Sequence, residues 1–489
     1  MSKPVMRSGR IWLAALVLVI SAVAFFAGPP LYRIALLGSG YMAQQLCAGL
    51  FVSGRSFDHV MAEDLSGPGF GPLALFTPHV DETAKTVRAS AFGIAGQTAV
   101  YRHGLGCTLI RHRSAAAYGA ENPDPFTADL PAAPDAEWPQ GSRVAAGAWG
   151  RDFEWPDGVD GQAASQAVDA VFADPDPERP RATRALVVVH KGRIVAERYA
   201  PGFDAHMPLV GWSMSKTGTN ALIGLRVKDG ALALDDTRLM PEWLGRDDMR
   251  SEITVNTLLR MTSGLAFHED PDDKLSDVSQ MMFVQGNTAA FAASKPLAYA
   301  PGTHWSYSTG AAAILSGVLR ETFDDERDYL SYPRERLFGP LGMRTAQLPP
   351  DPSGTLMGGA FLYASARDWA RLGLLYLQDG KWGGEQILPK GWVAYTTRPT
   401  AQSPEDEYGA QVWLKLEKSE NLGEPPMPAD SFYMLGHNGQ AVAMIPSKDL
   451  VVVRLGQTLN GGDWDTARDL GPLVNAFPDK TPRARFLGE

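Results

Sequence analysis

The sequence predicts an α+β domain in which β-strands at both ends enclose a largely helical middle. Residues 185–200 form an apolar run, a Lys191-Gly192 turn and an alternating segment, which is typical of a β-hairpin. Residues 435–456 contain a second pair of strand-like segments around a turn at 446–449. Between them, apolar residues recur at helical spacing. We therefore expect an antiparallel sheet packed against helices and beside a helical lobe.

The size and charge of the chain limit its organisation and its partners. At 489 residues it exceeds what one hydrophobic core usually supports. We expect a signal segment at 1–30, an N-terminal extension and linker at 31–160, and the main domain at 161–480. The formal net charge of -10 and the lack of a dense Lys/Arg stripe argue against a nucleic-acid partner.

The N-terminus has the pattern of an export signal. Lys3, Arg7 and Arg10 precede an uncharged apolar run at residues 11–28. This is close to the roughly 20 residues that span a bilayer, and the basic side is expected to stay in the cytoplasm. A cleaved signal peptide is the alternative, with a small-residue triplet at 22–24 as its site. We expect an uncleaved anchor in a bacterial-type inner membrane, with the main domain periplasmic or extracellular.

Export bears on whether the two cysteines can form a disulfide. Cys47 and Cys107 both follow the apolar run, so both would be exported. An oxidising compartment permits a disulfide, although spacing alone cannot show that the two residues are close. A lipid-bearing Cys47 is disfavoured because the residues before it do not resemble a lipoprotein cleavage site.

The extension and linker carry weaker signals. Two β-prone runs, at 87–94 and 98–101, suggest a hairpin that turns at residues 95–97. Residues 111–160 are rich in Ala, Pro, Asp and Gly, and they predict a linker or a loop on the surface.

Several helices are expected in the main domain, at residues 253–265, in the second half of 300–321, and at 358–378 and 463–477. The acidic stretch 268–274 predicts a solvated loop. A metal site formed by Asp270, Asp272 and Asp273 is conceivable there but disfavoured. The chain contains no HExxH, CxxC, phosphate-loop or G-x-S-x-G motif.

The stretch 211–217, GWSMSKT, precedes a helical pattern that stops at Gly230. Ser213 therefore opens a helix, and Lys216, three residues later, shares its face. A desolvated lysine can accept a serine proton, and a helix N-terminus can stabilise an oxyanion. The alternative is that Ser213 is an N-cap and Lys216 is solvated. Ser215 is the rival nucleophile.

Three motifs that follow one another along the chain favour a catalytic role for Ser213 over the N-cap alternative. They are SMSK at 213–216, YST at 307–309 and HNG at 437–439. With PGTHWSYSTG, PLGM and the stretch 365–388, the chain over about 180–475 resembles the serine hydrolases of the β-lactamase and penicillin-binding-protein fold. The resemblance is to the class C-related branch, which includes esterases, D-alanyl-D-alanine carboxypeptidases and 6-aminohexanoate-dimer hydrolase. It implies a β-lactamase/transpeptidase-like fold and catalysis without a cofactor or metal.

The resemblance also implies roles for particular residues. Ser213 would be the acylated nucleophile, Lys216 its base partner and Tyr307 a second proton-transfer residue, all within hydrogen-bond reach. The HNG motif would lie on the edge strand, where Gly439 lets substrate approach. The backbone N–H of Gln440 would join that of Ser213 in the oxyanion hole.

The chain departs from the family pattern at two places. Thr309 replaces an Asn that contacts a substrate carbonyl, and His437-Asn438 replaces a Lys-Thr pair that holds a substrate carboxylate. Both changes favour a hydrolase of small uncharged esters or amides. The alternatives are a D-alanyl-D-alanine carboxypeptidase or β-lactamase, and, in another class, a catalytically idle protein that binds cell-wall peptide.

Overall fold

The structure is a computed structural model that describes residues 28–110, 113–126, 128–131, 135–150, 152–245, 248–416, 427–459 and 462–480. The signal segment predicted at the N-terminus lies outside the described residues, apart from 28–30.

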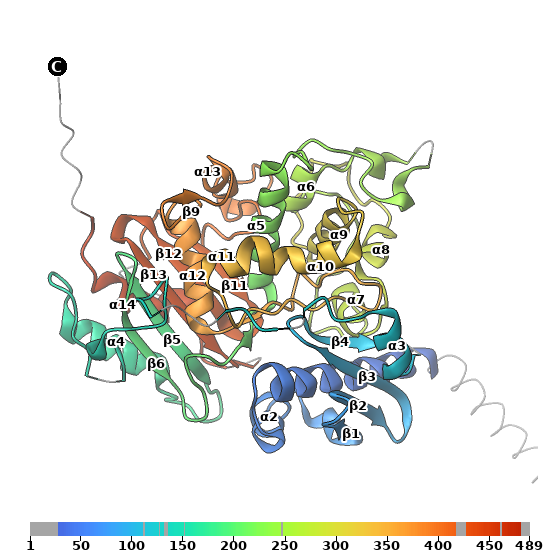
Figure 1. Cartoon of the computed structure of the whole chain (residues 1–489), viewed down its shortest axis with the longest axis horizontal. Coiled ribbons are helices and arrows are strands. Elements are labelled where there is room, and N and C mark those ends of the chain that lie inside the picture. The colour runs from blue at the N-terminus through green and yellow to red at the C-terminus, as the bar shows by residue number, and fades with distance from the viewer. Residues whose placement is uncertain are drawn as a thin grey trace, which may run out of the picture.

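An antiparallel five-stranded sheet of order β11-β12-β13-β5-β6 forms the centre of the main domain (Figure 1). Strands from both ends of the domain meet in the middle of this sheet, where Val452 of β13 pairs with Val188 of β5. The predicted antiparallel sheet is therefore present. Its strands are β5 (Thr183–His190), β6 (Arg193–Tyr199), β11 (Phe432–Gly436), β12 (Gln440–Ile445) and β13 (Leu450–Gly456).

Helices cover both faces of this sheet, and for that reason β5, β12 and β13 are buried along their whole length. Helix α12 (Ala366–Leu377) packs on one face and places Trp369 in the main core. Helices α4 (Gly161–Phe172) and α14 (Thr466–Asn475) pack together on the other face.

The helical lobe lies between β6 and β11 in the chain. The expected helix at 253–265 is much shorter, because Met261 (φ 60°) and Gly264 (φ 79°) adopt left-handed conformations that end it. The helices of the lobe are α5 (Ser215–Lys228), α6 (Val255–Leu259), α7 (Asp277–Phe283), α8 (Thr288–Ala293), α9 (Thr309–Arg320), α10 (Glu326–Pro333), α11 (Gly339–Leu341) and α13 (Trp392–Thr396).

The N-terminal module combines a long helix, Gly28–Val52, with a four-stranded meander. This helix is long and apolar enough to cross a membrane, but most of its apolar window is packed inside the protein. Helix α2 (Phe57–Asp64) links it to the strands β1 (Phe76–Asp81), β2 (Thr86–Ala91), β3 (Ile94–Arg102) and β4 (Gly106–Ile110).

The hairpin expected in this module turns at a different place. Its turn is Phe92-Gly93, with φ values of 49° and 78°, rather than residues 95–97. Two successive left-handed residues make the tight two-residue turn that suits a twisted hairpin. Gly96 instead lies within β3, where its bare backbone leaves room for the Arg88 guanidinium.

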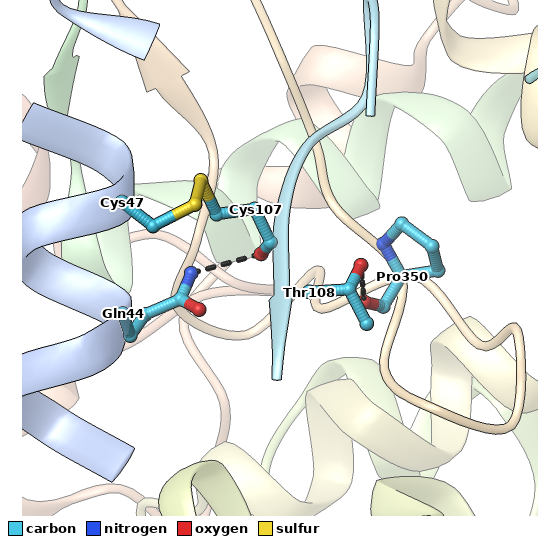
Figure 2. The surroundings of a disulfide bond; sticks show 5 residues. All are labelled: Gln44, Cys47, Cys107, Thr108 and Pro350. Carbon is cyan, nitrogen blue, oxygen red and sulfur yellow. Dashed lines mark hydrogen bonds between the residues drawn. A yellow bond between two sulfur atoms is a disulfide. The ribbon is translucent and has the colours of Figure 1, made fainter. Parts of the chain in front are cut away.

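A disulfide between Cys47 and Cys107, with Cα atoms 6.1 Å apart, joins the long helix to β4. Figure 2 shows β4 between that helix and a loop of the main domain. Gln44 Nε2 donates to the Cys107 carbonyl at 2.9 Å, and Thr108 Oγ1 donates to the Pro350 carbonyl at 2.8 Å. The module is thus tied to the main domain through β4.

Candidate active site

The segment around Ser213 is held from both sides. Strand β7 (Leu209–Val210) pairs with β8 (Tyr363–Ala364), and the 3₁₀ turn Trp212–Met214 leads directly into α5. Trp212 adopts φ 47°, which is unusual for a bulky residue. Gly211 is needed because a Cβ there would lie 2.1 Å from the Trp369 ring. Ser213 therefore opens the helix as expected, but from a 3₁₀ turn.

Lys216 is directed at Ser213. Its Nζ donates to Ser213 Oγ at 2.9 Å, to Thr309 Oγ1 at 2.9 Å and to the Gly359 carbonyl at 3.1 Å. Of these three oxygens, the Gly359 carbonyl can only accept a hydrogen bond, whereas the Ser213 and Thr309 hydroxyls can each donate or accept. Lys216 is only 1% exposed, which contradicts the alternative of a solvated lysine.

Ser215, the rival nucleophile, faces another part of the protein. It is 1% exposed, and its Oγ accepts a hydrogen bond from the Leu362 backbone N–H at 2.9 Å. Ser213 is partly accessible and is the serine bonded to Lys216.

Tyr307 contacts Lys216 through its ring. Lys216 Nζ lies 4.8 Å from the ring centroid, in a cation–π contact. The ring stacks on Trp413 at 5.3 Å and meets Tyr408 edge-on at 5.8 Å. Within the described residues, the Tyr307 hydroxyl makes no hydrogen bond to Ser213 or Lys216. Tyr307 therefore lies at the site through its ring, and the expected hydrogen bond from its hydroxyl to Ser213 or Lys216 is not formed in the described part of the chain.

Glu269 is a site residue that the sequence reasoning missed. Its carboxylate accepts hydrogen bonds from the Thr309 backbone N–H at 2.6 Å and from the Thr309 hydroxyl. Because the same hydroxyl accepts from Lys216, the three side chains form a chain, Lys216 to Thr309 to Glu269. Burial raises the pKa of Glu269, while Lys216 and the Thr309 hydrogen bonds oppose that rise.

The acidic stretch 268–274 is a loop as expected, but Glu269 points into the protein while most of the other residues are exposed. Asp270 accepts from the backbone N–H groups of Asp272 and Asp273, which closes the loop on itself. No group of metal-ligating side chains is assembled anywhere in the described part of the chain. Glu269 instead follows the buried Phe267, which packs where a Cβ on Gly310 would lie. The sequence signal for the inward position of Glu269 is the aromatic residue Phe267, two positions earlier, because alternate residues of an extended segment face the same side.

The HNG motif lies next to Ser213, although not on the edge strand. Residues His437–Gly439 form the turn between the edge strand β11 and β12, so this part of the prediction is wrong. The chain reverses there because Asn438 (φ 60°) and Gly439 (φ 78°) are left-handed. A Cβ on Gly436, just before the turn, would lie 2.2 Å from the Gly211 carbonyl.

Arg454 holds this turn from the β13 side. It is fully buried, and its Nη1 donates to the carbonyls of Asn438 at 3.2 Å and Gly439 at 2.8 Å. Burial lowers the pKa of Arg454 to about 9, so the guanidinium stays charged at neutral pH. A Cβ on Gly439 would lie 2.5 Å from the Arg454 guanidinium. This internal packing requires the glycine, whereas we expected it to make room for substrate.

Two further side chains complete the turn. The buried Gln440 amide links the turn to β13. It donates to the His437 carbonyl in the turn at 3.2 Å and to the Gly456 carbonyl at the end of β13 at 2.6 Å. The exposed His437 packs its ring edge-on against Trp212 at 5.7 Å. Desolvation lowers the pKa of His437, and Asp272 opposes that effect. His437 is therefore neutral at pH 7.

The fold and these motifs identify a class of protein, and comparisons with known proteins agree. The chain belongs to the β-lactamase family, whose model matches residues 168–475. It is 24% identical over 301 residues to 6-aminohexanoate-dimer hydrolase of Paenarthrobacter ureafaciens, which covers 56% of this chain and 72% of that protein.

Solved structures show the same fold. One, from Bacillus anthracis and assigned as a 6-aminohexanoate-dimer hydrolase, has a TM-score of 0.53 and 22% identity, covering 68% of this chain and 86% of that one. EstCE1, described as a hydrolase with promiscuous acyltransferase activity, has a TM-score of 0.50 and 17% identity, covering 64% and 98%. The predicted β-lactamase/transpeptidase-like fold is therefore confirmed, and the members of this family are hydrolases.

Proposed function

We propose that this chain is a serine hydrolase that cleaves a small, uncharged ester or amide through an acyl-enzyme on Ser213. The observation that carries the proposal is the 2.9 Å hydrogen bond between Ser213 Oγ and the buried Lys216 Nζ. A lysine withdrawn from water and directed at an accessible serine is the arrangement needed to activate that hydroxyl.

In the acylation step, Ser213 Oγ attacks the substrate carbonyl carbon while its proton passes to Lys216 Nζ, which acts as the base. The carbonyl oxygen becomes an oxyanion, held by the backbone N–H groups of Ser213 and Gln440. When the tetrahedral intermediate collapses, Tyr307 gives a proton to the leaving alcohol or amine and regains it from Lys216. Water then attacks the acyl ester, its proton returns through the same pair, and the acid and free Ser213 are released.

Thr309 and Glu269 position the lysine in this scheme. Thr309 Oγ1 and the Gly359 carbonyl are the two acceptors of Lys216 besides Ser213, and Glu269 fixes Thr309 in turn. Thr309 stands where the family has an Asn, and in this chain its hydroxyl joins Lys216 to Glu269.

The electrostatics of the site support an uncharged substrate. The family uses a lysine where this chain has His437, and His437 carries no charge at pH 7 because desolvation lowers its pKa. The carboxylate of a β-lactam or of a D-alanyl peptide therefore loses a charged partner. The relatives named as a 6-aminohexanoate-dimer hydrolase and a promiscuous hydrolase also support ester or amide cleavage.

A catalytically idle peptide-binding protein is the alternative of another class. Binding alone would not require a buried lysine that makes three hydrogen bonds beside an accessible serine, because withdrawing a lysine side chain from water is costly. The presence of Ser213, Lys216 and Tyr307 together therefore favours an enzyme over a binding protein.

We also propose that the apolar run at 11–28 anchors the enzyme in a bacterial inner membrane, with the hydrolase domain on the periplasmic side. The basic residues before the run and the disulfide between Cys47 and Cys107 support this location, since disulfides persist in oxidising compartments.

Hydrolysis of a nitrophenyl ester tests the proposed function. We expect Ser213→Ala to lose nearly all turnover, whereas Ser215→Ala, an equal truncation two residues away, keeps it. Equal activity of the Ser213→Ala enzyme and the unmodified enzyme would overturn the proposal.

A further inference from the structure

Large apolar side chains are exposed together at one end of the N-terminal module. Of the twelve large hydrophobic residues that are exposed in the described part of the chain, six come from three segments of this module. They are Leu31 (61%), Tyr32 (49%), Ile34 (38%), Leu75 (55%), Phe92 (78%) and Ile94 (64%). We call these six residues the apolar rim.

Contacts along the long helix show that the three segments meet at the same end. Gly38 packs against Phe76, which follows Leu75, and Gln97 Nε2 donates to the Leu36 carbonyl at 2.6 Å. Phe76 also pairs with Ala91, beside the β2–β3 turn.

The other end of the helix lies at the opposite end of the strands. Lys85, in the β1–β2 turn, lies 4.7 Å from the centre of the Phe51 ring. The helix thus runs along the sheet from the β2–β3 turn towards the β1–β2 turn. Residues 31–34 lie between about half a turn and two turns beyond Leu36 and Gly38, at the end of the sheet that carries the Phe92-Gly93 turn. Figure 1 shows this helix and β1–β3 at the edge of the molecule, away from the five-stranded sheet.

The composition of these segments fits lipid rather than water. Residues 28–38, 70–76 and 91–97 contain a single charged residue, Arg33, and no acidic one. A single arginine can extend to phosphate headgroups while its stem remains among acyl chains. Tyr32 is of the type that gathers at membrane interfaces. Exposed apolar side chains that gather at one end of a module, without acidic groups among them, mark an interaction surface.

The segment that precedes the apolar rim in the chain indicates that the rim contacts a membrane. The uncharged apolar run ends at Gly28, the first described residue of the long helix and only three residues before Leu31. If the run spans a bilayer, as we propose for the anchor, the rim is held at the surface of that bilayer.

We propose that the apolar rim is a second membrane contact, in which the Phe92-Gly93 turn and the first residues of the long helix dip into the lipid surface. This contact rests on the proposed anchor and is independent of the acyl-enzyme chemistry. It would fix the orientation of the hydrolase domain above the membrane, which a single spanning segment cannot do.

The test uses the full chain reconstituted in vesicles of phosphatidylcholine and phosphatidylglycerol. Both native cysteines are in the disulfide, so a Phe92→Cys variant can be labelled selectively with an environment-sensitive dye. Ile94→Cys is a second position in the rim. Thr83→Cys is the matched control, because Thr83 is exposed in the turn at the opposite end of the same strands.

We expect the dye at positions 92 and 94 to emit at shorter wavelength and to lose fluorescence when the lipids carry a shallow spin label. The dye at position 83 should show neither change. Vesicle flotation tests the anchor separately, since a failed anchor leaves the protein at the bottom of the gradient. Protein that floats while the dye at 92 and 94 remains in water would overturn the rim proposal. So would a dye that is shielded but not quenched by lipid, because a protein would then cover the rim.

Discussion

Glu269 and Thr309 form the hydrogen bonds that orient Lys216 beside Ser213. Thr309 accepts from Lys216 and donates to Glu269, so its single hydroxyl has one partner on each side. The bond from the Thr309 backbone N–H also places the Glu269 carboxylate at the first turn of α9, where a helix favours an anion. Glu269 is thus both a helix cap and a positioning residue, and kinetics can separate the two roles.

Replacing Glu269 with Gln should lower kcat for a nitrophenyl ester by about 10- to 150-fold, because a charge-assisted hydrogen bond contributes about 1.5–3 kcal/mol. The pH profile should change as well. Burial raises the pKa of Glu269, so protonation of this group as the pH falls adds an acidic limb to kcat in the unmodified enzyme. Glu269→Gln cannot titrate and should lack that limb.

Conservative variants separate positioning from capping. Glu269→Asp should recover part of kcat, and Thr309→Asn, which restores the residue typical of the family, should retain more activity than Thr309→Val. A Glu269→Gln enzyme that loses thermal stability but keeps the unmodified kcat and pH profile would show that Glu269 only caps α9.

The identity of His437 predicts how turnover depends on the charge of the substrate. Neutral histidine offers no ion pair, so nitrophenyl esters should be turned over much better than a chromogenic cephalosporin at pH 7. His437→Lys should raise kcat/KM for the cephalosporin by about 10- to 150-fold, because it restores a charge-assisted hydrogen bond of about 1.5–3 kcal/mol.

The pH dependence of this preference has a definite sign. Desolvation lowers the pKa of His437, so its charged form gains population only below the ordinary value of about 6.5. In the unmodified enzyme, the ratio of kcat/KM for the cephalosporin to that for the ester should rise as the pH falls, and it should stay flatter in His437→Lys. A preference for the cephalosporin at pH 7 would mean that another cation holds the carboxylate.

At the level of elements, the site depends on two short turns that face each other. One is the 3₁₀ turn Trp212–Met214 before α5, and the other is the turn His437–Gly439 between β11 and β12. Arg454 of β13 holds the second turn through its carbonyl groups. The position of the Gln440 N–H therefore depends on a side chain from the next strand.

Arg454→Met should lower kcat by at least about 10-fold, since loss of one oxyanion donor typically costs 10²–10³ in kcat and the variant displaces the donor rather than deleting it. Stability should fall as well, because the carbonyls of Arg181, Asn438 and Gly439 lose a buried donor, so kcat is compared at a temperature where both enzymes are folded. Arg193→Met is the matched control, since Arg193 is exposed on β6 and far from the turn. An Arg454→Met enzyme with unmodified kcat would exclude this support.

The elements also show which parts of the structure the sequence could predict. The hairpin 185–200, the start of α5 and the helix after Tyr307 follow from periodicity and local turn residues, which are properties of neighbouring positions. The HNG turn contains the Asn-Gly pair that is typical of a tight hairpin, so local residue types do indicate it. The early end of the helix at 253–265 depends instead on left-handed Met261, a residue type that rarely adopts this conformation. The contact of Glu269 with Thr309 joins positions 40 apart and depends on packing between loops.

At the scale of the whole molecule, the N-terminal module supports the nucleophile. Its core includes residues of the long helix and β4, and it also contains Trp212, the neighbour of Ser213, together with Phe361. Gly359, whose carbonyl accepts from Lys216, lies two residues before Phe361. The module is therefore part of the structure that holds the active site.

Replacing both cysteines with Ser should reduce stability and activity together. The disulfide closes a separation of 60 residues, for which the chain-entropy relation gives about 4 kcal/mol. We expect a lower unfolding temperature, and ester hydrolysis that is lost at the temperature where the module unfolds. Thermal unfolding followed alongside activity, with and without reductant, measures this. An unchanged unfolding temperature, or reductant sensitivity that persists without the cysteines, would contradict it.

The most direct test of the account is to locate a covalent adduct after treating the full chain with a fluorophosphonate. Trypsin releases residues 199–216 as one peptide, which contains both Ser213 and Ser215. We predict one adduct, placed on Ser213 by the fragment ions between the two serines and absent from Ser213→Ala. An adduct on Ser215, or ester hydrolysis by an enzyme that forms no adduct, would contradict the proposal that Ser213 is the acylated nucleophile.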